Sequence, residues 1–150
     1  MGYDVHTEKG FVNRGNLHRM KKLMRLARQG DRMTLAFLGG SITQGSVSSQ
    51  YTNCYAYLVY DWFVRRFPKT AFTYVNAGVG GTTSQFGVSR VEEDVLAFKP
   101  DFVIIEFSVN DDNTDFYQET YEGLVRKVYG NQFAPAVLLV HNIFYDSGVS

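Results

Sequence analysis

Hydrophobic and polar positions along the chain form two kinds of segment that follow one another in turn. Short apolar runs bounded by glycine, proline or polar turn residues are typical of buried strands. Such runs lie at residues 33–38, 72–75, 102–107 and 136–144. Longer segments with apolar residues three and four positions apart predict amphipathic helices. These segments lie at residues 16–29, 55–67, 89–98 and 116–129.

Local signals mark several of the predicted helix ends. Asn16 is a suitable N-terminal cap for the first helix, and Gly30 is a suitable C-terminal stop. Ser89 is placed to cap the third helix. Glu92 and Glu93 would then lie in its first turn, where negative charge is favourable to the helix dipole.

The regular alternation of strands and helices predicts the fold class. A chain of this kind forms an α/β fold, a parallel sheet with helices on both faces. Residues 136–144 are nearly all apolar, as expected of a strand that is covered on both faces. The length of 150 residues suits one domain. We place this domain at residues 15–150, after an N-terminal arm or linker at residues 1–14, which lacks a hydrophobic period.

Three polar loops follow predicted strands directly. Ser41 comes after two glycines at the end of the first strand, a glycine-rich run at residues 76–84 follows the second, and Asn110 follows the third. A parallel sheet brings these loops to one edge, where α/β proteins bind ligands. A hydroxyl, a run of backbone N–H groups and a side-chain amide are the parts needed for acyl transfer, namely a nucleophile and an oxyanion hole.

Each loop also has a simpler interpretation. A serine after two glycines often serves only as a turn residue, and Thr43 excludes a Gly-x-Ser-x-Gly elbow. Residues 40–45 resemble the glycine spacing of a phosphate-binding loop, although Ser46 stands where that loop has its lysine. A non-catalytic, flavodoxin-like module that binds a small molecule or phosphate is therefore the alternative function.

The three loops together resemble a known family. Gly39-Gly40-Ser41-Ile42-Thr43, residues 76–83 and Ser108-Val109-Asn110-Asp111 resemble, in order and spacing, three sequence blocks of the SGNH (GDSL-type) esterases and lipases. The resemblance implies a three-layer α/β/α sandwich with flavodoxin-like strand order 2-1-3-4. It also implies that Ser41 is the nucleophile, and that the N–H groups of Ser41 and Gly81 and the amide of Asn110 form the oxyanion hole. If the alignment of residues 76–83 to the family block is shifted by one residue, Gly80 takes the role of Gly81.

The family's closing Asp-x-x-His block does not occur in these 150 residues. The histidines at positions 6, 18 and 141 lie on no recognisable motif. We therefore expect residues 15–150 to be an SGNH hydrolase domain truncated at its C-terminus. The catalytic histidine and aspartate would then follow Ser150, and this chain alone would be inactive, because a serine without its base is nearly inert.

The resemblance implies ester hydrolysis through an acyl-serine intermediate, with water as the second acceptor. No organic cofactor or metal is required. Asp111, Asp112 and Asp115 are the carboxylates that suggest a metal site, but loop carboxylates are more often solvated or helix-capping. No long apolar lid is present, so we expect a short acyl group. The expected substrate is a small ester or an acetylated carbohydrate.

Composition excludes several other classes of function. Lys and Arg together number 15, as do Asp and Glu, so no net field attracts nucleic acid or a membrane surface. Cys54 is the only cysteine, so no internal disulfide forms. No apolar run reaches the ~18 residues of a membrane span, and no signal peptide begins at Met1. We therefore expect a cytoplasmic location.

Overall fold

The computed structural model describes residues 7–142. The strands are β1 Met33–Gly39, β2 Phe72–Gly78, β3 Phe102–Glu106 and β4 Ala136–Leu139. The α-helices are α1 His18–Gln29, α2 Ser41–Gln44, α3 Tyr55–Arg66, α4 Ser84–Asp94 and α5 Asp115–Tyr129. Three short 3₁₀ segments are η1 Thr7–Gly10, η2 Tyr51–Asn53 and η3 Leu96–Phe98. Residues 9–18 are exposed. The domain boundary near residue 14 stays a prediction.

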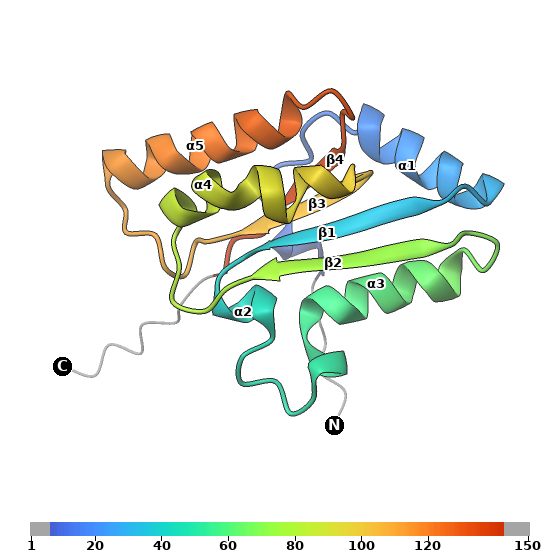
Figure 1. The fold of residues 1–150 in the computed structure, drawn as a ribbon, viewed down its shortest axis with the longest axis horizontal. Helices are drawn as coiled ribbons and strands as arrows, with labels where there is room; N and C mark the ends of the chain where they lie inside the picture. The colour runs from blue at the N-terminus through green and yellow to red at the C-terminus, as the bar shows by residue number, and fades with distance from the viewer. Residues whose placement is uncertain (1–6, 143–150) are drawn as a thin grey trace.

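The four strands form one parallel sheet in the order β2-β1-β3-β4 (Figure 1). Strand β1 pairs with β2 from Met33 opposite Phe72 through Gly39 opposite Gly78. Its other edge pairs with β3, where Gly39 lies opposite Glu106. This order confirms the predicted flavodoxin-like sheet. It also sets the residues that follow β1 between those that follow β2 and β3.

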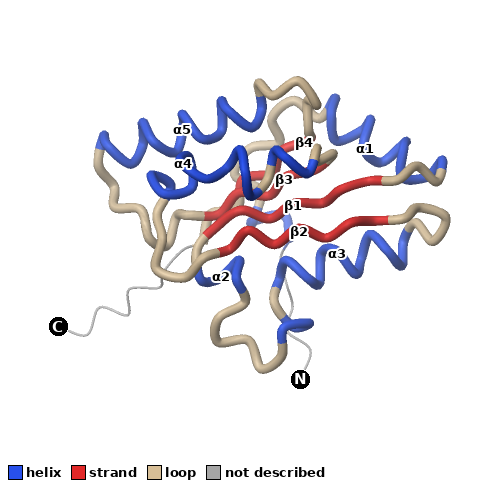
Figure 2. Tube along the Cα trace, viewed as in Figure 1, coloured by secondary structure: helices blue, strands red, loops and turns tan. Residues whose placement is uncertain are grey.

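Helices cover both faces of the sheet, which gives three layers (Figure 2). Helices α1 and α3 pack on one face, against Leu35 and Phe37 of β1. Helices α4 and α5 pack side by side on the other face, where Ala36 and Leu38 contribute to the core. Alternate residues of β1 therefore enter two separate cores, and burial on both sides explains the continuous apolar pattern of this strand.

Helix α4 begins at Ser84, five residues before the predicted start at Ser89. Its first N–H group donates to Oδ1 of Asp111 at 2.9 Å, so a residue of a distant loop supplies the N-terminal partner. Glu92 and Glu93 consequently lie in the C-terminal half of the helix, and the prediction that they favour its N-terminal dipole was wrong.

Strand β4 is shorter than predicted and ends at Leu139 instead of near residue 144. Its neighbour β3 ends at Glu106. The backbone hydrogen bonds between the two strands therefore end with the N–H of Val140, which donates to the carbonyl of Ile105. Within residues 7–142, β4 has one neighbouring strand, and Leu138 and Leu139 are 41% and 38% exposed. The predicted strand residues 143–144 lie outside the described part of the chain.

An apolar groove of about 500 Å³ lies on the α1–α3 face of the sheet. Its walls include Met20 of α1, Trp62 of α3 and Phe102 of β3. Leu58 and Trp62 of α3 line this groove and are 52% and 50% exposed. This face of the sheet is therefore less completely covered than the α4–α5 face. No helix within residues 7–142 is long and apolar enough to cross a membrane.

Candidate active site

Ser41 is the first residue of the one-turn helix α2, directly after β1 and Gly40. The turn is anchored by Thr43, which is fully buried and whose Oγ1 shares a 2.8 Å hydrogen bond with the hydroxyl of Tyr55. Ser41 itself is only half-buried. A buried strand and a buried threonine thus hold a partly accessible hydroxyl at the carboxyl edge of the sheet.

The glycine-rich loop after β2 approaches α2 closely. A Cβ on Gly78 would lie 2.6 Å from the Cα of Gln44, so no larger residue fits there. Gly80 donates its N–H to Oε1 of Gln44 at 2.8 Å. Gly81 has φ +71°, a left-handed conformation that favours glycine. None of the hydrogen bonds described for residues 7–142 uses the N–H of Gly81 as its donor.

Asn110 lies in the loop after β3 and contacts both other loops. Its Nδ2 donates to the carbonyl of Thr82 at 2.7 Å. The same Nδ2 would lie 2.8 Å from a Cβ built on Gly40, the residue before Ser41. On the β2 side, a Cβ on Gly80 would lie 3.7 Å from the Cβ of Ser41. The three loops predicted to meet at one sheet edge therefore do meet there.

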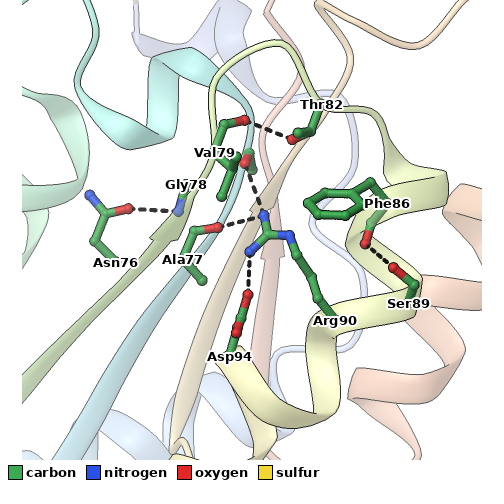
Figure 3. Close-up of polar contacts among 10 residues, drawn as sticks. Asn76, Ala77, Gly78, Val79, Thr82, Phe86, Ser89, Arg90 and Asp94 are labelled. Carbon is green, nitrogen blue, oxygen red and sulfur yellow. Dashed lines mark hydrogen bonds and ion pairs between the residues drawn. The ribbon is translucent and has the colours of Figure 1, made fainter.

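Further hydrogen bonds connect the strand ends beneath these loops, and sequence reasoning missed them. Asn76 donates from Nδ2 to the Thr43 carbonyl at 2.8 Å and accepts the Gly78 N–H at 2.9 Å. Arg90 of α4 donates to the Ala77 carbonyl at 2.7 Å, as Figure 3 shows. The sequence held one signal for Arg90: it is a basic residue among apolar positions of a helical segment, four residues before Asp94.

The aspartates considered as metal ligands have other surroundings. Asp111 accepts the first N–H of α4, and Asp115 begins α5. Within the described range 7–142, no group of three or more histidine, cysteine, aspartate or glutamate side chains gathers in a way that could hold a metal ion. Asp111 instead connects the Asn110 loop to the helix that follows the glycine-rich loop.

The partly buried phenols of Tyr55 and Tyr121 lie near Glu106, whose side chain is buried. Burial raises the pKa of Tyr55 to about 12; Thr43 lowers it and Glu106 adds to the rise. Burial also raises the pKa of Tyr121, with Glu106 and Asp111 as further causes. Both phenols therefore stay protonated at neutral pH, and neither is suited to act as a general base there.

The histidines do not complete the site within the described residues. His18 begins α1, and His141 follows β4 with its ring centroid 6.1 Å from that of Tyr121. None of the hydrogen bonds described for residues 7–142 joins either histidine side chain to Ser41. His6 lies outside the described residues.

Comparison with known proteins gives one family and several relatives. The sequence model of the GDSL-like Lipase/Acylhydrolase family matches residues 37–145. An acetylxylan esterase of Geobacillus stearothermophilus is 36% identical over 86 residues, which are 51% of this chain and 39% of the relative.

Several solved structures are also similar, among them the following two. A two-domain esterase (CEX) active on acetylated mannans, co-crystallised with mannopentaose, is 62% identical with a TM-score of 0.95. The match covers 97% of this chain and 40% of that esterase. A variant of Axe2, an acetyl-xylooligosaccharide esterase from Geobacillus stearothermophilus, is 26% identical with a TM-score of 0.58, covering 71% of this chain and 58% of Axe2. This chain therefore spans about two fifths of the length of the first two relatives.

Proposed function

Because the chain belongs to the GDSL-like lipase/acylhydrolase family, we propose that it carries the nucleophile and oxyanion hole of a serine esterase that deacetylates carbohydrates. One observation carries the proposal. The Ser41 turn lies against Gly80 on one side and the Asn110 amide on the other. The relatives named for acetylxylan and acetylated mannans support an acetylated polysaccharide as the substrate class.

In the proposed reaction, Oγ of Ser41 attacks the acetyl carbonyl carbon while a base takes its proton. The carbonyl π electrons move to the oxygen, which becomes an oxyanion. Collapse of this intermediate breaks the bond to the sugar oxygen, which leaves with a proton as the alcohol. Water then attacks the acetyl-serine in the same way, releases acetate and restores the Ser41 hydroxyl.

Three donors are available for the oxyanion. The N–H of Ser41 lies at the start of α2, where backbone N–H groups lack an intrahelical acceptor. Gly81 is favoured over Gly80 because the Gly80 N–H already donates to Gln44. An asparagine amide has two N–H donors, so Asn110 can donate one to Thr82 and the other to the oxyanion. Preorganised donors of this kind are often the largest single contribution to acyl-transfer catalysis.

The base is the remaining part of the mechanism. We expect a histidine, since its ordinary pKa allows proton transfer near neutral pH. Neither His18 nor His141 hydrogen bonds to Ser41 among the contacts of residues 7–142. An Asp-x-x-His block after Ser150 as the source of the base stays a prediction.

Acetate release from the full-length protein tests the proposal. Acetylated mannan and acetylated xylan would each be incubated with wild type, Ser41→Ala and the matched control Ser46→Ala, which alters an exposed serine of the same segment. We expect Ser41→Ala to lose at least about 10³-fold in rate and Ser46→Ala to match wild type. Equal acetate release by wild type and Ser41→Ala would contradict the proposal.

A further inference from the structure

Arg90 of α4 places a charged group beneath the loops of the candidate active site. Its side chain is 9% exposed, and Nη1 pairs with Asp94 at 2.8 Å. Its Nη2 donates to the carbonyl oxygens of Ala77 at 2.7 Å and Gly39 at 3.4 Å. Figure 3 shows the guanidinium directed from α4 toward the end of β2. One guanidinium group therefore bridges two neighbouring strands.

The two carbonyls that Arg90 contacts lie close in sequence to the proposed donors. Gly39 is two residues before Ser41, and Ala77 is four residues before Gly81. Between these carbonyls and the donors, the chain bends at Gly40 after β1 and turns at Gly80 and Gly81 after β2, so small changes at the strand ends would reorient both loops. The guanidinium contacts the last residue of β1 and the last but one of β2, just before each loop departs from the sheet.

The ion pair with Asp94 does not by itself explain this placement. Asp94 is 43% exposed, whereas Arg90 is nearly buried. On α5, Arg126 and Glu122 form an ion pair with the same four-residue spacing, yet they are 77% and 60% exposed. An arginine that forms only an ion pair can therefore stay exposed to solvent. We attribute the burial of Arg90 to its two carbonyl contacts. Burying a charge is favourable only when such partners compensate for the lost water.

Lysine could not reproduce these contacts. A guanidinium is a planar fork with five N–H donors, so it can reach a carboxylate on one side and two carbonyls on the other. An ammonium is a single point on a flexible stem. Arg90→Lys therefore keeps the positive charge but loses the fixed bridge between the strands.

We propose that Arg90 is a positioning residue of the oxyanion hole, which holds the ends of β1 and β2 at the spacing that aligns the N–H groups of Ser41 and Gly81. The proposal rests on the proposed esterase function. Arg90 touches no reacting atom and acts through the backbone that it fixes. It also links α4 to catalysis, although the helix contributes no residue to the reaction itself.

The experiment compares Arg90→Lys with two controls in the full-length protein. Arg126→Lys makes the same replacement at the exposed ion pair, and Asp94→Asn removes the acidic partner while leaving both carbonyl contacts. For an acetyl ester, we expect Arg90→Lys to lower kcat about 10–100-fold, with KM within about twofold, because misplaced groups affect the transition state most. The kcat of Arg126→Lys should match that of wild type, and Asp94→Asn should lower kcat less than Arg90→Lys does.

A second measurement follows the backbone directly. In ¹⁵N-resolved NMR spectra, the amide signals of Ser41 and Gly81 should shift in Arg90→Lys and stay unchanged in Arg126→Lys. A thermal transition close to that of wild type would show that the variant is folded. Unchanged amide signals, or a kcat within about twofold of wild type, would overturn the positioning role.

Failure of the proposed function would give a different result. Wild type and Ser41→Ala would then hydrolyse acetyl esters equally. In that case the role in an oxyanion hole falls with the proposed function, and the amide signals decide only whether Arg90 positions the two loops: shifts at Ser41 and Gly81 support this, and their absence overturns it.

Discussion

The side-chain amide of Asn110 donates a 2.7 Å hydrogen bond to the carbonyl oxygen of Thr82. This contact joins the loop after β3 to the glycine-rich loop after β2, directly beyond Gly81. The amide nitrogen also lies beside Gly40, the residue before Ser41. One N–H of Asn110 thus fixes the relative position of two loops. No hydrogen bond described for residues 7–142 uses the other, which can serve the proposed oxyanion hole.

Asn110→Ala should lower kcat by about 10²–10³-fold, or ~3–4 kcal/mol, with KM little changed. The reason is that a donor to the oxyanion acts mainly in the transition state. Steady-state kinetics with an acetyl ester, alongside thermal unfolding, measure both effects. Asn113→Ala is the matched control, because that exposed asparagine of the same loop bonds Gln118 instead. A near-normal kcat for Asn110→Ala would remove Asn110 from the mechanism.

Gly81→Ala should destabilise the protein by about 1–2 kcal/mol and also lower kcat. A Cβ at Gly81 would meet nothing within 4 Å, so the penalty comes from φ +71° and not from a clash. Relaxing that strain rotates the peptide that carries the proposed N–H donor. Urea unfolding and kinetics on the same variant test both parts.

Gly123→Ala on α5 is the control for that variant. A Cβ there also meets nothing within 4 Å, but the residue lies inside a helix without positive φ. This replacement should stabilise the protein by about 0.5–1 kcal/mol and leave kcat unchanged. If both glycine variants changed stability in the same direction, the conformational explanation for Gly81 would be wrong.

Tyr55 should make stability fall in alkaline solution. Burial raises the pKa of its phenol from 10.0 to about 12, so the folded state holds this proton more tightly than the unfolded state does. The contribution of Tyr55 to the free energy of unfolding is therefore complete below pH 10. It is lost as the pH rises toward 12, by about 2–3 kcal/mol in total. The pKa of Tyr74 and of Tyr121 is raised in the same direction.

Urea unfolding of wild type and Tyr55→Phe at pH 8, 9, 10 and 11 measures this effect. The variant should be about 1 kcal/mol less stable at pH 8, since Thr43 loses its hydrogen-bond partner. The difference between the two proteins should narrow above pH 10. Parallel curves over the whole range would show that Tyr55 does not titrate with folding.

The sequence was sufficient to predict the sheet and the meeting of its three loops, because both depend on local patterns. The apolar runs locate β1, β2 and β3, and the residues after each strand carry the hydroxyl, the glycines and the amide. Parallel pairing then brings the loops of Ser41, Gly80 and Asn110 to one edge of the sheet, and the strand order makes them neighbours there. The strand order came from the family resemblance, since hydrophobic periodicity does not determine which strands pair.

The features that were missed depend on contacts between residues far apart in the sequence. Helix α4 begins early because Asp111, 27 residues away, accepts its first N–H. Arg90 lies 51 residues from Gly39, whose carbonyl it contacts. Gln44 reaches Gly80 across 36 residues. A single sequence contains no local signal for such pairs, which become evident only in the folded chain.

The most direct test of the account is covalent labelling of the full-length protein with a fluorophosphonate, followed by peptide mapping in a mass spectrometer. An activated serine nucleophile reacts with this probe, whereas an ordinary turn serine does not. We predict one adduct, on Ser41, which is absent from Ser41→Ala. An adduct on Ser84 or Ser108 instead, or undiminished labelling of Ser41→Ala, would contradict it.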